Sequence, residues 1–153
     1  MRLRALVCAF VLLSLSVFST FALPQLTVKT FIGTWSTKWA RVDYPDCNGC
    51  TGHWAETDLT VTEDTAGSNK VLDGTWTSVS PDKTTKSTGY MHGTFTSKDG
   101  VWRGVWWANG ANEHGNFRFT LMEGIPPVKR SFSGKYTAAK HGDTEYDWNG
   151  VLK

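Results

Sequence analysis

Long hydrophobic runs are scarce in this sequence, and the one that occurs lies near the amino terminus, at residues 5–21. Arg2 and Arg4 precede it, and Thr20 and Ala22 place small residues at the two positions that signal peptidase reads. We therefore predict a secretory signal peptide that is cleaved after Ala22, and a secreted, extracellular protein. A membrane anchor is the alternative, but it needs about 20 uninterrupted apolar residues, and serines interrupt this run.

Net charge is also lacking once the signal peptide is removed. Residues 1–22 carry two of the 16 Lys and Arg residues and none of the 14 Asp and Glu residues, so the mature chain is balanced. Residues 23–153 number 131 (153 − 22), which is enough for a single domain with a core. A neutral chain indicates no basic surface for nucleic acid or anionic lipid. We expect a soluble domain with neither nucleic acid nor a membrane as partner.

Cysteine is rare: there are three, and Cys8 leaves with the signal peptide. Cys47 and Cys50 remain, and an even pair in an oxidising compartment most often forms a disulfide, which we predict here. Together with His53 the same residues could instead bind zinc, because thiolates and imidazole suit that metal. A disulfide would remove both sulfur ligands, so we expect no metal and no cofactor.

Helical periodicity is absent, and a repeat with the period of a β-strand takes its place. Six segments place a glycine midway between two large apolar residues, at 31–35 (a looser copy), 72–76, 91–95, 102–106, 132–136 and 148–152. Because side chains in a strand alternate between two faces, the glycine and both large residues share one face. The opposite face is mostly polar, with Val105 and Val151 as exceptions. The pattern predicts antiparallel strands that are wet on one side.

Turn signals separate eight such strands, which we predict at residues 33–40, 55–63, 70–79, 88–97, 100–108, 114–122, 130–138 and 145–153. Glycine on the aromatic-bearing face suits a sheet that coils tightly enough to close, and we expect Gly104 to make room between Trp102 and Trp106. We predict an all-β fold, an eight-stranded antiparallel up-and-down β-barrel. A two-sheet β-sandwich is the alternative that the same alternation permits.

Phe31-Ile-Gly-Thr-Trp35 resembles the opening strand of the calycins, the lipocalin, fatty-acid-binding and avidin barrels. The later Leu-x-Gly-Thr-Trp and Phe-x-Gly-x-Tyr strands are most similar to those of avidins. The resemblance implies a ligand-binding barrel. Avidins follow the first Gly-x-Trp with an Asn and a Ser that hold biotin, whereas Ser-Thr-Lys-Trp follows here. Biotin binding is therefore not carried over to this chain.

An eight-stranded barrel can hold one small ligand, and aromatic walls with polar groups at the mouth are typical of such pockets. We predict that a small apolar or ring-shaped molecule binds among Trp35, Trp39, Trp76, Phe95, Trp102, Trp106, Tyr136 and Trp148. The loops after strands 1, 3, 5 and 7 share one end of such a barrel, and we expect them to supply the rim residues His53, Asn109, His114 and His141. The alternative is that these rings fill the core completely.

Two further classes of function stay open. An interaction or glycan-binding module would use exposed tryptophans, for which Trp54 and Trp107 are candidates. A small enzyme would use acid–base groups such as Glu113 beside His114, or His141 near Asp143. The sequence has no nucleophile elbow, phosphate-binding loop or HExxH motif, so an enzyme is the less favoured interpretation and no catalytic residue is assigned.

Overall fold

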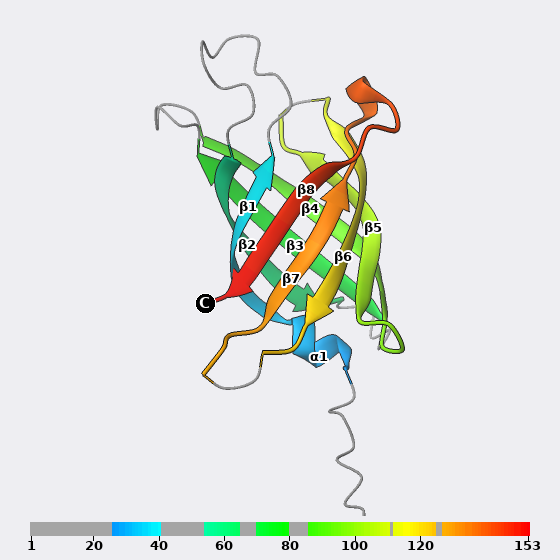
Figure 1. Cartoon of the computed structure of the whole chain (residues 1–153). Helices are drawn as coiled ribbons and strands as arrows, with labels where there is room; N and C mark the ends of the chain where they lie inside the picture. The colour runs from blue at the N-terminus through cyan, green and yellow to red at the C-terminus, as the bar shows by residue number, and fades with distance from the viewer. Residues whose placement is uncertain (1–25, 41–53, 65–69, 80–85, 111, 125–126) are drawn as a thin grey trace, which may run out of the picture.

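The eight strands form one closed antiparallel barrel in the order β1 to β8, with β8 paired back to β1 (Figure 1). The structure is a computed structural model and describes residues 26–40, 54–64, 70–79, 86–110, 112–124 and 127–153, without the side chains of residues 54 and 55. The strands are β1 Gly33–Ala40, β2 Trp54–Glu63, β3 Val71–Val79, β4 Lys86–Thr96, β5 Val101–Ala108, β6 His114–Met122, β7 Ser131–Tyr136 and β8 Tyr146–Leu152. The barrel prediction is confirmed, and the sandwich is excluded.

Closure depends on the pairing of the first and last strands. Trp39 of β1 lies opposite Trp148 of β8, and Trp35 lies opposite Leu152. Because every strand has two neighbours, no strand edge is left to pair with another chain. The predicted boundaries of all eight strands agree with the observed ones to within two residues.

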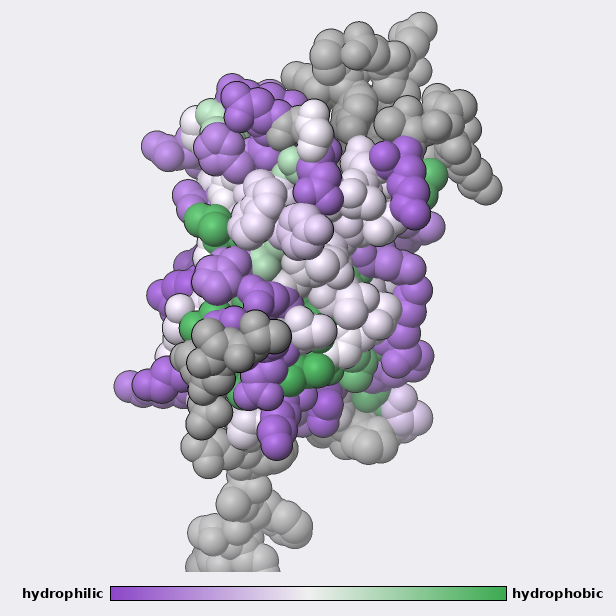
Figure 2. Space-filling view, turned by 180° about the vertical axis from the view of Figure 1, so that it is seen from behind, coloured by the Kyte–Doolittle hydropathy of each residue, from purple (hydrophilic) through white to green (hydrophobic). Residues whose placement is uncertain are grey.

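The alternation of faces also holds. Large apolar side chains point inward on every strand, and the most deeply buried of those on strands are Trp35, Leu59, Val61, Leu72, Met91, Phe95, Trp102, Phe119 and Phe132. Val105 and Val151, the two exceptions on the polar face, are both 47% exposed, so they lie outside as predicted. Hydrophilic and intermediate residues dominate the outer surface in Figure 2, and hydrophobic ones appear only in small areas.

The glycines allow neighbouring strands to approach closely, but at Gly104 the structural reason differs from the one that we expected. Gly93 and Gly104 lie opposite each other on β4 and β5. A Cβ atom on Gly104 would clash with the backbone carbonyl of His92, and one on Gly93 would lie 2.9 Å from the Cα of Gly104. The space beside Gly104 is therefore taken by the neighbouring backbone. We expected it to separate the rings of Trp102 and Trp106.

A short helix that the sequence pattern did not predict closes one end of the barrel. This helix, α1 (Val28–Phe31), precedes β1 and carries Phe31 into the interior with no exposed surface. The indole Nε1 of Trp35 donates a hydrogen bond of 2.9 Å to the carbonyl of Phe31. Four helical residues show no periodicity in a sequence. The large side chains of residues 31–35, the looser copy of the glycine motif, thus lie inside as expected, although Phe31 reaches the core from a helix.

The two ends of the barrel have different coverings. We call the end that carries α1 the α1 end; the short 3₁₀ helix η1 (Ala139–His141) stands over the opposite end, the η1 end (Figure 1). The connections from β5 to β6 and from β7 to β8 lie at the η1 end, as an up-and-down order requires. In the part of the chain that the structure describes, no helix has the length and apolar character needed to cross a bilayer.

Candidate functional site

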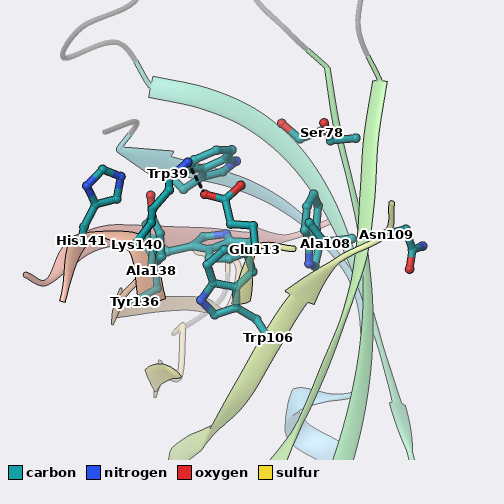
Figure 3. Close-up of a pocket in the computed structure, with 13 residues that line it drawn as sticks. Trp39, Ser78, Trp106, Ala108, Asn109, Glu113, Tyr136, Ala138, Lys140 and His141 are labelled. Atoms are coloured by element: carbon teal, nitrogen blue, oxygen red, sulfur yellow. Dashed lines mark ion pairs between the residues drawn. The ribbon is translucent and has the colours of Figure 1, made fainter. Parts of the chain in front are cut away.

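A cavity of about 130 Å³ lies inside the barrel at the η1 end (Figure 3). Strands β1, β3, β5, β7 and β8 supply its aromatic walls, while η1 and the connection before β6 supply polar groups. Its lining consists of Trp39, Trp76, Ser78, Ser87, Trp106, Ala108, Asn109, Glu113, Tyr136, Ala138, Lys140, His141 and Trp148. Most of this lining is apolar, and a few polar groups converge on it, which is the usual make-up of a small-molecule site.

Five aromatic rings form the walls of this cavity. Their neighbouring ring centroids lie 5.7 to 6.4 Å apart, and most of the pairs meet edge to face, with Trp39, Trp76, Trp106, Tyr136 and Trp148 as members. This is the arrangement that aromatic side chains favour. The rings thus support one another around the cavity wall.

Hydrogen bonds hold two of these rings to β1 and β2. The indole of Trp148 donates to the hydroxyl of Thr37 at 2.9 Å, and Thr37 in turn donates to the carbonyl of Thr57 at 3.0 Å. The indole of Trp39 donates to the hydroxyl of Thr57 at 2.6 Å. Thr37 and Thr57 are both buried, so these bonds form away from water, where a lost partner is costly. The two threonines therefore fix the orientation of two wall rings.

The other half of the wall is held by backbone carbonyls. The indole of Trp106 donates to the carbonyl of Thr137 at 2.8 Å, just after β7. The hydroxyl of Tyr136 donates to the carbonyl of Ala40 at 2.6 Å, at the end of β1. Each bond joins strands that are distant in sequence. Together they preorganise the cavity before any ligand arrives.

Three buried polar atoms of the lining have no hydrogen-bond partner among the described residues: Nε1 of Trp76, Oγ of Ser78 and Nε2 of His141. Trp102 Nε1 is the fourth such atom in that part of the chain, and it lies outside the lining. A buried donor or acceptor without a partner costs about 1–3 kcal/mol. Three of the four therefore belong to residues that line one cavity, although the atoms themselves have less than 1 Å² of accessible surface.

Charged groups at the mouth of the cavity are paired with each other. The Nζ of Lys140 lies 2.6 Å from Oε1 of Glu113, and Figure 3 marks this ion pair with a dashed line. Both side chains keep contact with water, since that of Lys140 is 55% exposed and that of Glu113 is 35% exposed. Asn109 is exposed at the same end of the barrel, where its Nδ2 donates a hydrogen bond of 3.0 Å to the hydroxyl of Thr88.

The structure divides the predicted aromatic set between two places. Trp39, Trp76, Trp106, Tyr136 and Trp148 line the cavity. The remaining three, Trp35, Phe95 and Trp102, are buried outside the cavity lining, and each has its ring near that of Phe31.

The predicted rim residues are also divided. Asn109 and His141 line the cavity. His114 lies opposite Trp107 in the β5–β6 register and is exposed, so it belongs to the outer surface. His53 and the predicted disulfide partners Cys47 and Cys50 lie outside the described residues.

Several lining residues were not predicted from the sequence. Ser78 follows Trp76 by two positions in the predicted third strand, so the alternation of faces was a signal that could have found it. Lys140 and Ala138 sit in and before η1, and loop residues show no such period. Ser87 comes from β4, in register with Ser78.

The acid–base candidates Glu113 and His114 do not face one site. Glu113 pairs with Lys140, whereas its neighbour His114 is on the outer surface. Within the described ranges no three His, Cys, Asp or Glu side chains gather as a metal would require.

No known protein-family model matches the chain, and a comparison with curated protein sequences finds no match. Function must therefore be inferred from the cavity itself.

Proposed function

We propose that this protein is a secreted, calycin-like barrel that binds one small ring-containing molecule in the cavity at its η1 end. The observation that carries the proposal is a cavity of about 130 Å³ walled by five aromatic rings. Four of these rings are held in place by hydrogen bonds to threonines or to backbone carbonyls. Walls fixed in this way keep a space open that flexible side chains would otherwise fill.

The volume sets the size of the ligand. An apolar cavity of about 150 Å³ in another protein holds one benzene molecule, so 130 Å³ suits a single ring with few substituents. A flat ring also matches walls of Trp and Tyr, since aromatic pairs stack or meet edge to face. Larger lipids or fused ring systems would have to extend through the mouth.

The calycin resemblance of the glycine motifs supports the same class of function, because closed eight-stranded barrels of that kind hold ligands inside. Biotin is not the ligand that we propose. Thr37 belongs to the Ser-Thr-Lys-Trp segment that follows Trp35, where avidins have the Asn and the Ser that hold biotin. The hydroxyl of Thr37 is already engaged by Trp148 and by the carbonyl of Thr57.

Neighbouring tryptophans on opposite faces of β5 give a matched test. Trp106 lines the cavity and is 6% exposed, while Trp107 is 39% exposed on the outer surface. The panel would contain toluene, phenol, indole and naphthalene, with binding followed by tryptophan fluorescence and calorimetry. We expect Trp106→Leu to weaken the binding of single rings about tenfold or more, and Trp107→Leu to leave it unchanged.

Folding of each variant is checked by its unfolding transition, and Trp39→Leu serves as a second cavity variant. If no compound in the panel saturates the wild-type protein, the proposal is wrong. It is equally wrong if Trp107→Leu weakens binding as much as Trp106→Leu does.

A surface binder is the second candidate function, and one observation favours it. Tyr90 and Trp107 are exposed side by side on β4 and β5, with ring centroids 5.8 Å apart. Exposed aromatic rings of this kind could stack against sugar rings. For this function a soluble glycan array should detect binding that Trp107→Leu abolishes and Trp106→Leu preserves.

A further inference from the structure

The buried polar atoms of the cavity constrain what the ligand must carry. The indole nitrogen of Trp76 can only donate a hydrogen bond, whereas the Ser78 hydroxyl and the His141 ring nitrogen can donate or accept. None of the three has a partner among the described residues. A hydrocarbon ring would leave all three atoms unpaired, so it would not recover the cost of their burial.

Trp76 and Ser78 face the cavity from one wall. They lie two residues apart on β3, and both point inward. The Trp76 ring meets the rings of Trp106 and Trp148 edge to face, each with centroids 6.4 Å away, which holds its N–H in one direction. Ser87 of β4 lies next to Ser78 in the register and also lines the cavity. A donor-rich strip therefore runs along one side of an otherwise aromatic wall.

The charges of the lining argue for a neutral ligand. Lys140 and Glu113 are the charged side chains of the described lining apart from the titratable His141, and they neutralise each other at 2.6 Å. An ionic ligand would lose its water without gaining an opposite charge, which is a large cost in an apolar site. To bind it, the protein would have to break the pair at the mouth.

We infer that the cavity selects a neutral single-ring molecule that carries a carbonyl oxygen or a ring-nitrogen acceptor, with the acceptor directed at Trp76 and Ser78. This inference rests on the proposed function and names its ligand class. Without ligand both polar atoms have less than 1 Å² of accessible surface, so a small movement of the wall must uncover them. The acceptor then takes the hydrogen of the Trp76 indole, and the Ser78 hydroxyl adds a second bond. The ring itself packs against the remaining aromatic walls.

Four probes of nearly equal shape separate the possibilities. Acetophenone is neutral and has a carbonyl acceptor; α-methylstyrene replaces that oxygen with a methylene group; benzoate is an anion; and benzamidine is a cation. Titration calorimetry with the secreted protein would give their dissociation constants. We expect acetophenone to bind about tenfold more tightly than α-methylstyrene and more tightly than either ion, since one or two hydrogen bonds distinguish the neutral pair.

Variants of the protein test which atoms cause the preference for acetophenone over α-methylstyrene. Trp76→Phe removes the indole N–H, and we expect the preference for acetophenone over α-methylstyrene to fall by most of its tenfold value. Ser78→Ala should reduce it in the same direction, and it keeps the inference testable if Trp76→Phe does not fold. Trp102→Phe is the matched control, because it removes the one unpaired buried indole N–H of the described chain that lies outside the cavity lining. It should leave the preference unchanged.

Each remaining outcome has one meaning. Equal affinities for acetophenone and α-methylstyrene would overturn the ligand class while leaving a ring-binding cavity in place. Tighter binding of benzoate or benzamidine than of acetophenone would overturn neutrality. If none of the four probes binds while a compound of the first panel does, the ligand class is wrong. If toluene, phenol, indole and naphthalene also fail to bind, both the ligand class and the proposed function are wrong.

Discussion

The two halves of this barrel are built from the same alternating strands, yet one half is filled and the other encloses a cavity. Toward the α1 end, neighbouring ring centroids lie 4.5 to 6.1 Å apart among Phe31, Trp35, Phe95, Trp102, Phe119 and Phe132. Toward the η1 end, the wall rings lie 5.7 to 6.4 Å apart around about 130 Å³. The first difference between the halves is Phe31, which α1 inserts into the filled half alone.

The second difference between the halves is where the partners of the indole N–H groups lie, since Trp35 in the filled half donates to Phe31 of helix α1. At the η1 end, Trp39, Trp106 and Trp148 each donate to a hydroxyl or a carbonyl of the barrel wall. These bonds keep the rings at the wall, where they border the cavity. The comparison teaches that an inward tryptophan can either fill a barrel or line a cavity in it. Having an N–H partner does not decide which, because Trp35 in the filled half also donates, to the carbonyl of Phe31, whereas Trp76 lines the cavity without a partner among the described residues.

The largest expected effect concerns the filled half. Phe31→Ala removes a fully buried ring that packs against the rings of Trp35, Trp102 and Phe132. We expect the free energy of unfolding to fall by about 3–5 kcal/mol, as measured by urea denaturation. A loss below about 1 kcal/mol would break the comparison, because it would show that this half is not tightly packed.

An intermediate effect is expected where the cavity wall is anchored. Thr37→Val removes the hydroxyl that accepts from Trp148 and donates to Thr57, so the Trp148 N–H loses its buried partner. We expect a loss of about 1–3 kcal/mol in unfolding free energy, together with weaker ring binding. Thr34→Val is the control, since Thr34 makes an exposed contact of 3.5 Å with Thr60 and should change stability by at most about 0.5 kcal/mol. Equal effects of the two substitutions would contradict the anchoring role.

The smallest expected effect belongs to an unpaired group of the cavity. Ser78→Ala removes a buried hydroxyl that has no partner among the described residues. Without ligand, we expect the free energy of unfolding to stay the same or to rise by up to about 1 kcal/mol, because an uncompensated polar group is lost. Thermal unfolding with and without acetophenone would measure this, and the ligand should stabilise the variant less than the wild type. A clear destabilisation without ligand would mean that the hydroxyl has a partner after all.

Most of the fold could be predicted because each strand carries its own pattern. Trp102, Gly104 and Trp106 share the inner face, and Trp107 lies outside, as a period of two demands. Helix α1 escaped prediction because four residues are too few to show a period. The signal peptide and the cysteine pair stay predictions, since both lie outside the described residues.

The candidate site was harder to predict than the fold. The sequence placed His114 and His141 together at one rim, but His114 begins β6 on the outer face while His141 lines the cavity from η1. Strand β6 begins at His114 as predicted, and the alternation that buries Phe117 and Phe119 puts His114 on the outer face, so the strand pattern held this signal. The three residues of η1 are too few to show a period, so no such signal was present for His141.

The sequence by itself determined the number of strands, their alternation and the aromatic interior, because these follow from local backbone geometry and from the burial of one face. The tertiary structure decided that the sheet closes as a barrel and does not form a sandwich, since closure depends on the pairing of β1 with β8. Only the tertiary structure decided which half of that interior is filled and which polar atoms lack partners. The reason is that a cavity depends on ångström-scale distances between side chains from strands far apart in the chain. Trp76 and Trp102 show this: both are inward tryptophans with an unpaired N–H, and only Trp76 borders a space that a ligand can enter.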